Sequence, residues 1–333
     1  MSTFQIPIIK ETKNYWLVRT NAGKYYDEFL REGYIGINWN DITYDEIDDL
    51  DRDSIIDLLK ERDPDVKNPS NAARQLVVLR KVMQPGDAVI ITGPSSYIFS
   101  IGEVEEDGFF TQEVGPSELE ANPKACPYTK RRKVRWVKTL TKWEVEMPMF
   151  KMLQHSRQTI AEANDYKDII EGKIHDFYIR GEVAQLTLKV RKEGNIPAFT
   201  FFSLGKEVLD LAEEFIASSE MMEGVDINQI ETKININSPG SFNFLGSAKV
   251  VTVIAAIVLL TTGGSVNIPL PNGSSFEAQI NGIIPTVDEF LNDRQEREHR
   301  ELLIKEHMKD LEVDSPDDLK KLMDATENES SKK

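Results

Sequence analysis

Cysteine is almost absent from this chain, and so are the short motifs of the common enzyme classes. The one cysteine among 333 residues, Cys126, excludes an internal disulfide framework and a zinc site made of several cysteines. The glycine-rich phosphate loop, the His-Glu-x-x-His metal motif and the Gly-x-Ser-x-Gly elbow do not occur. From the sequence we therefore predict no cofactor, no bound metal and no catalytic residue.

The chain also lacks a surplus of basic residues. It has 40 basic and 56 acidic residues, a formal net charge of −16 at pH 7, which argues against polyanion binding over the whole surface but leaves room for a local basic patch. The opening residues, MSTFQIPIIKET, lack the apolar stretch of a secretory signal. Together with the single cysteine, this predicts a cytoplasmic protein.

What the chain does contain is globular material of uneven charge. It is 40% hydrophobic and 29% charged, and it is longer than one average domain. Asp41–Asp65 is strongly acidic, Lys124–Lys142 carries eight basic residues and no acidic one, and Ile234–Phe276 has a single charge, Lys249. These shifts predict four parts: an amino-terminal domain (1–147), an α+β connecting domain (148–232), a hydrophobic segment (233–285), and a charged helix with a disordered tail (286–333).

The amino-terminal part has the pattern of a small β-barrel. Residues 15–20 and 33–39 are rich in strand-forming side chains, and residues 24–33 form an amphipathic helix closed by Gly33. Residues 132–140 alternate basic and apolar side chains, as in a strand with one buried and one positive face. We predict the α+β class, with a curved β-barrel flanked by helices.

The connecting part predicts a small α+β unit. Residues 150–163 and 166–178 have helical patterns, and 182–190 alternates as a strand does. Residues 203–218 form a strongly amphipathic helix that begins at Ser203.

Five spaced motifs in the first part carry a resemblance to a known family. They are the strand YWLVRT with its arginine, the glycine-containing strand GYIGINW, the PGD turn, the run YIFSIGEV, and the final strand RKVRW. In this order they resemble the EVE-like branch of the PUA superfamily, in particular the amino-terminal domain attached to restriction endonucleases and other bacterial anti-phage defence proteins. The resemblance covers residues 12–145. It departs from the family pattern at Asn38, where a glycine is usual.

The resemblance implies a domain that binds nucleic acid, a modified base or a nucleotide signal. A pocket for an exposed base needs aromatic faces and hydrogen-bond donors, for which the candidates are Trp16, Arg19, Trp39, Tyr97 and Trp136. A phosphate backbone needs cations, for which the candidates are Lys130, Arg131, Arg132, Lys133 and Arg135. The alternative is that the tryptophans are barrel core and that the basic strand is a solvated edge.

The apolar segment is the second informative feature. Residues 242–266 include one charge, Lys249, and are long enough to cross a bilayer, which would attach the protein to the inner membrane. The strictly apolar centre, Val253–Leu260, is short, and Val250–Thr262 is rich in β-branched residues, so a buried helix or strand competes with a transmembrane helix.

The first functional hypothesis is a defence-type sensor and effector. In it the first domain binds nucleic acid or a nucleotide, and the apolar part, embedded in a membrane or in a homo-oligomer, acts as effector. A second hypothesis is a modification-dependent endonuclease with a degenerate Glu-x-Lys site at Glu231 and Lys233. A third is a soluble interaction protein whose apolar segment forms an oligomer core.

Overall fold

The structure, a computed structural model, describes residues 7–155, 158–235, 240–261, 275–292, 295–314 and 316. The chain divides into two compact units, one of Thr12–Ile170 and one of Met1–Glu11 with Glu171–Lys333. The boundary falls inside helix α7 (Lys167–Ile174), not at residue 147 as the sequence predicted. The reason is the short strand β6 (Ile160–Glu162), which pairs with the first strand and so draws residues 148–170 into the first unit.

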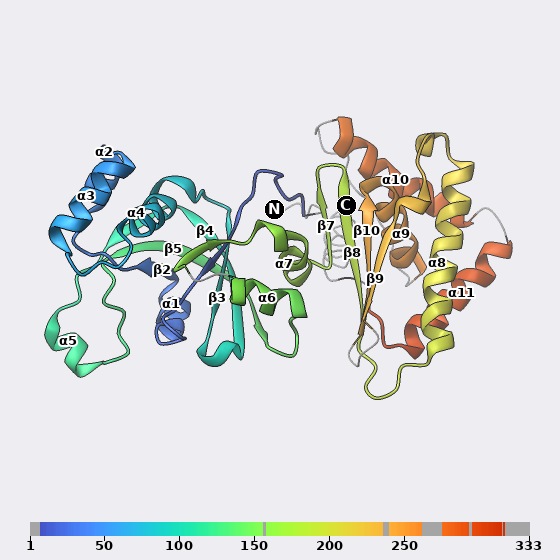
Figure 1. The fold of residues 1–333 in the computed structure, drawn as a ribbon. Coiled ribbons are helices and arrows are strands. Elements are labelled where there is room, and N and C mark those ends of the chain that lie inside the picture. The colour runs from blue at the N-terminus through green and yellow to red at the C-terminus, as the bar shows by residue number, and fades with distance from the viewer. Residues whose placement is uncertain are drawn as a thin grey trace, which may run out of the picture. The chain divides into compact units, whose positions relative to one another are not determined.

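The first unit is built on a six-stranded sheet that curls into a half-barrel (Figure 1). Its order is β2-β5-β4-β3-β1-β6, and β1 and β3 are its one parallel pair among the described residues. The strands are β1 (Tyr15–Val18), β2 (Tyr34–Ile37), β3 (Ala88–Thr92), β4 (Ile98–Thr111), β5 (Lys130–Thr141) and β6.

Irregular pairing between the two longest strands accompanies this curl. The β4–β5 ladder shifts register between Ile101 and Gly102 and again between Val104 and Phe109. Extra residues of this kind bend a strand and increase its twist. Helices flank the sheet: α1 (Tyr26–Glu32), α2 (Tyr44–Asp49), α3 (Arg52–Arg62), α4 (Pro69–Val77) with a π-helical turn at Val78–Val82, α5 (Pro116–Ala121) and α6 (Met147–His155). The α+β class and the flanking helices are as predicted, while the sheet is a curled half-barrel where the sequence predicted a β-barrel.

The second unit has an antiparallel sheet covered by helices. The strand order is β7-β8-β10-β9, and Ile8 bridges to Ile179 on the outer edge of β7. The strands are β7 (Phe177–Arg180), β8 (Val183–Val190), β9 (Glu231–Asn235) and β10 (Gly240–Ser247). The helices are α8 (Ala198–Ser218), α9 (Ala248–Thr261), α10 (Ser275–Asn292) and α11 (Gln295–Asp310).

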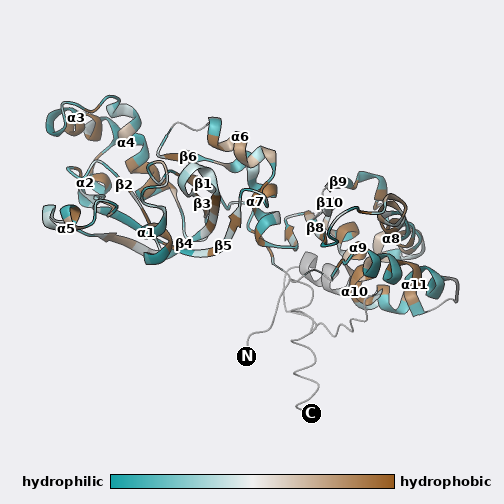
Figure 2. Ribbon diagram, turned by 90° about the horizontal axis from the view of Figure 1, so that it is seen from below, coloured by the Kyte–Doolittle hydropathy of each residue, from teal (hydrophilic) through white to brown (hydrophobic). Residues whose placement is uncertain are grey.

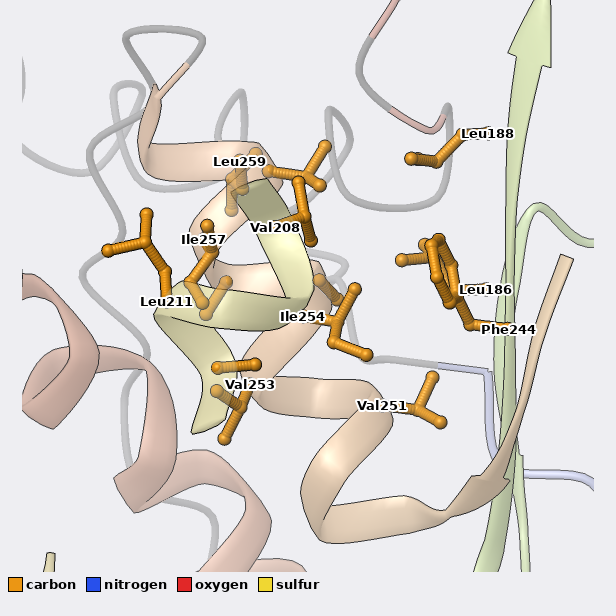
Figure 3. Close-up of a cluster of buried hydrophobic side chains, with 14 of the residues drawn as sticks. Leu186, Leu188, Val208, Leu211, Phe244, Val251, Val253, Ile254, Ile257 and Leu259 are labelled. Atoms are coloured by element: carbon orange, nitrogen blue, oxygen red, sulfur yellow. The ribbon is translucent and has the colours of Figure 1, made fainter. Parts of the chain in front are cut away.

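Helix α9 is the centre of this unit and contains most of the apolar segment. It packs against β8 and β10 on one side and against α8, α10 and α11 on the others. Figure 3 shows Val251 and Ile254 directed toward Leu186 and Phe244 of the sheet, and Ile257 beside Leu211 of α8. Nearly every residue of α9 is buried, and in Figure 2 this apolar helix lies among more polar ones.

The predicted transmembrane helix is therefore wrong. No helix among the described residues combines the length and the hydropathy that a membrane crossing requires. The apolar run is divided between two elements: residues 242–247 are the end of β10, and α9 has only 14 residues. At 1.5 Å per residue such a helix is about 21 Å long, against about 30 Å for the bilayer core. Residues 262–266 lie outside the described residues.

The charged end of the chain also contributes to this core. Helix α11, within the predicted charged helix, buries Ile304 and Met308, and Leu311 and Val313 follow them into the same cluster. Most of the predicted tail, residues 317–333, lies outside the described residues.

Candidate functional site

Two of the predicted base-stacking residues have structural partners inside the first unit. The Trp16 indole is buried and donates from Nε1 to the Asp87 carboxylate at 2.9 Å. The Trp136 indole donates from Nε1 to the carbonyl oxygen of Phe29 at 2.8 Å, and its ring lies against Gly102, where an added Cβ would come within 2.7 Å of it. The buried Trp16 ring therefore offers no free face to a ligand, whereas Trp136 is half-buried and held by its bond to Phe29.

Trp39 belongs to a strained turn held by a buried lysine. Its φ of 66° is rare for a residue with a side chain, and its ring is half-buried against the core. Lys130 donates from Nζ to the carbonyl oxygens of Trp39 and Ile42, 2.6 Å each. Burial lowers the pKa of Lys130 to about 8. Lys130 therefore closes this turn from within, which corrects its predicted role at a phosphate.

Arg131 and Arg132 are also turned into the protein. Arg132 donates from Nη1 to the carbonyl oxygens of Leu79 and Met83 at 2.8 and 2.7 Å, where α4 and its π-helical turn end. Arg131 lies over the Tyr34 ring, 4.3 Å from its centroid, and donates from Nη2 to the carbonyl oxygen of Cys126 at 3.1 Å. Both side chains are almost wholly buried, so the predicted phosphate contacts are not available to them here.

The remaining predicted cations are exposed but separate. Lys133 is exposed and forms no ion pair among the described residues, whereas Arg135 pairs with Glu103. Arg19 is exposed at the end of β1 and donates from Nη2 to the carbonyl oxygen of Leu153 at 2.9 Å. The structure thus does not bring the ten predicted residues into one pocket.

It does bring two strained loops together at the carboxyl ends of β1 and β3. The Thr20 hydroxyl donates to the carbonyl oxygen of Thr92 at 2.6 Å, which ties the loop after β1 to the end of β3. A Cβ on Gly23 would lie 2.3 Å from the nitrogen of Pro94, so the two loops touch at a point where only glycine fits. Crevices at the carboxyl ends of parallel strands are recurrent ligand-binding positions.

Both loops contain left-handed backbone at residues with side chains. Asn21 and Ala22 have φ of 52° and 55°, and Ser95 and Ser96 have φ of 53° and 55°. Such conformations each cost on the order of 1–3 kcal/mol and gather at ligand-binding sites. Among the described residues of the first unit, four of the five such residues lie in these two loops, which marks the loops as a candidate site.

Exposed aromatic rings on either side of a lysine complete this site. Tyr97 follows the second loop and is 55% exposed, and Trp143 follows β5 and is 84% exposed. The backbone nitrogen of Lys142 donates to the carbonyl oxygen of Tyr97 at 2.8 Å, which joins the two segments. Lys142 Nζ lies 3.8 Å from the Tyr97 ring centroid and 4.4 Å from that of Trp143. We call Tyr97, Lys142 and Trp143 the aromatic–lysine patch.

Of this patch, the sequence pointed only to Tyr97. Lys142 is the last residue of the basic stretch Lys124–Lys142, and neither Lys142 nor Trp143 is among the predicted site residues. The sequence does indicate an exposed ring at Trp143, because a Lys-Trp pair directly after a long strand places the aromatic side chain in a turn, where few neighbours can bury it. Glu144 forms that turn: its carboxylate accepts from the nitrogen and the hydroxyl of Thr141, both at 2.8 Å.

The Glu-x-Lys pair of the second hypothesis lies on β9, at the edge of the other sheet. Glu231 and Lys233 are exposed there, and the Asp226 carboxylate accepts from the nitrogen of Asn228 at 2.9 Å within its own turn. No three His, Cys, Asp or Glu side chains of the described residues are grouped to hold a metal.

Comparison with known proteins matches the first unit to a described family. Residues 14–164 match a family described as a domain of unknown function (DUF8426), over nearly the same range as the first unit. No curated protein and no solved structure matches the chain.

Proposed function

We propose that the first unit binds nucleic acid and that it holds an unstacked base on the aromatic–lysine patch. The sequence resemblance to the PUA-like sensor domains of bacterial defence proteins supports this function. The observation that carries it is the pair of exposed rings, Tyr97 and Trp143, on either side of Lys142.

Exposed aromatic rings favour bases that are already unstacked. A tryptophan at 84% exposure leaves a large apolar face in water, which a stacked base would cover. Lys142 Nζ occupies one side of both rings, so a base stacks on an outer face and its phosphate lies toward the ammonium. Duplex DNA offers no such base, so single strands or flipped bases are the expected ligands.

Exposed lysines near the aromatic–lysine patch make nucleic-acid binding compatible with the net negative charge of the chain. Lys24 is exposed in the first strained loop, and Lys138 is exposed on β5, a few residues before Lys142. The second unit offers the opposite: its hollow of about 710 Å³ at the end of α8 is lined by Glu213, Glu220, Glu223 and Asp226 among others. A polyanion is therefore expected on the first unit and not in that hollow.

The test is binding of fluorescently labelled single-stranded DNA and RNA to the full chain, measured by anisotropy over a salt series. Trp143→Ala and Tyr97→Ala should each weaken binding by roughly 5- to 150-fold, because stacking contributes about 1–3 kcal/mol per base. Lys142→Ala should lower the slope of log affinity against log salt by about one ion.

Two control variants remove an exposed aromatic ring and an exposed lysine outside the aromatic–lysine patch. Phe199 is an equally exposed aromatic residue in the second unit, and Lys67 is an exposed lysine on the segment between α3 and α4. Phe199→Ala and Lys67→Ala should bind as the unchanged protein does. Binding that is absent in the unchanged protein, or that survives Trp143→Ala, would refute the proposal.

A further inference from the structure

Strand β9 is an edge strand with an open outer side. It pairs with β10 on one side, and none of the described residues pairs with it on the other. The opposite edge of the same sheet differs, because Ile8 bridges to Ile179 there and Ile9 donates to its carbonyl oxygen at 2.8 Å. Open edges of this kind are templates for pairing with another strand.

The backbone direction of β9 shows which groups face outward. The carbonyl oxygen of Lys233 accepts from Asn243 Nδ2 of β10 at 3.3 Å, so it points toward β10. Backbone groups of successive strand residues point to opposite sides within the plane of a sheet. The N–H and C=O groups of Thr232 and Ile234 therefore point to the open edge.

The side chains of β9 are complementary to themselves in an antiparallel arrangement. Consider a second copy of the chain whose β9 pairs antiparallel along the open edge, with Thr232 opposite Thr232 of the partner subunit. Glu231 then lies opposite Lys233 of the partner subunit, and Lys233 lies opposite Glu231 of the partner subunit. Cross-strand partners of opposite charge stabilise such a pair. Both side chains are exposed on the face of the sheet away from α8 and α9 and form no ion pair among the described residues.

We infer that β9 joins two copies of this chain into a homodimer, with one continuous sheet across a two-fold axis at Thr232. Such an axis makes every contact occur twice, as an isologous interface requires. The central pair then exchanges the two outward-facing backbone hydrogen bonds of Thr232.

The helix-covered face of the sheet supports the same register. Ile234 is 44% exposed on this face. In the proposed register it lies opposite Ile230 of the partner subunit. Ile230 has an extended backbone (φ −76°, ψ 123°), so the pairing of the two strands can continue to this residue. Phe201 of α8 stacks on Phe242, the β10 neighbour of Ile234, so this end of the edge is apolar on the helix-covered face. Both faces of the edge thus present matching groups to a second copy.

The experiment measures the mass of the full-length protein by sedimentation and light scattering over a concentration series. Glu231→Lys and Lys233→Glu each turn two attractive pairs into two repulsive ones, so each variant should dimerise at least about tenfold more weakly. Mixing the two variants restores opposite charges at both positions, and the mixture should form a heterodimer as tight as the original dimer. The double variant, Glu231→Lys with Lys233→Glu, should also dimerise again.

Circular dichroism checks that each single variant is folded, and rescue in the mixture excludes a folding defect as the cause. A monomer at all concentrations in the unchanged protein overturns the proposal. So does a dimer that both charge reversals leave intact, because it would use another surface.

Discussion

Trp16 Nε1 donates to the carboxylate of Asp87 at 2.9 Å, and both residues are almost wholly buried. The same carboxylate accepts from the backbone nitrogens of Asn14 and Gln84, also at 2.9 Å. The Pro-Gly-Asp turn before β3 is thereby fastened to the start of β1. Two of the motifs behind the family resemblance therefore hold the sheet together.

Asp87→Asn should lower the free energy of unfolding by about 2–3 kcal/mol, because an amide has one acceptor oxygen for three donors and leaves buried groups unsatisfied. Urea unfolding followed by circular dichroism measures this. Asp45→Asn, on the exposed face of α2, is the control and should change little. Trp16→Phe should also destabilise the protein but leave oligonucleotide affinity unchanged, and weaker binding by that folded variant would return Trp16 to the binding site.

Lys130 should make stability depend on pH in the alkaline range. Its pKa falls to about 8 in the folded protein against 10.5 as the ordinary value. Between these pH values the unfolded chain binds the proton and the folded chain does not, so stability rises with pH. Relative to Lys130→Met, the unchanged protein should gain up to roughly 3 kcal/mol from about pH 7 to about pH 10.

Urea unfolding of both proteins at the two pH values measures this difference. The tyrosines are the same in both proteins, so their contribution to the pH dependence of stability cancels. Lys133→Met is the matched control, because Lys133 is the exposed neighbour on the same strand. It shows what loss of an exposed lysine on this strand does to stability at each pH. A stability difference for Lys130→Met that stays constant between the two pH values would contradict the prediction.

Ala256→Asp should unfold the second unit. Ala256 lies within α9 among side chains of the same core, and a charge there has no partner. Unpaired buried charges cost several kcal/mol, comparable with the whole stability of a domain. The expected result is loss of the part of the helical circular dichroism signal that α8–α11 contribute, together with the thermal transition of the second unit. Ala198→Asp, at the exposed start of α8, carries the same charge and should fold normally.

Local pattern alone was enough for much of the fold. The alternation at 182–190 predicted β8, the amphipathic spacing at 203–218 predicted most of α8, and the β-rich run at 15–20 predicted β1. The predicted helix at 150–163 was only half right, because residues 147–155 are α6 but 160–162 pair with β1 as β6. Strand pairing depends on a distant partner, which a local pattern does not contain.

The basic strand shows the same division. The sequence established that β5 alternates, and Arg132 shares its parity with Val134 and Trp136. It did not reveal that the carbonyl oxygens of Leu79 and Met83 accept hydrogen bonds from Arg132. Burial of a guanidinium depends on such acceptors, and the fold alone supplies them.

The apolar segment owes its burial to composition and its surroundings to tertiary structure. Its composition determined that most of residues 242–261 leave water, since so many apolar side chains with a single charge, Lys249, are stable only in an apolar environment. Whether that environment is lipid or protein was decided by tertiary structure, where β8, β10, α8, α10 and α11 cover α9. Both environments remove the same apolar surface from water, so only the arrangement of the covering elements tells them apart.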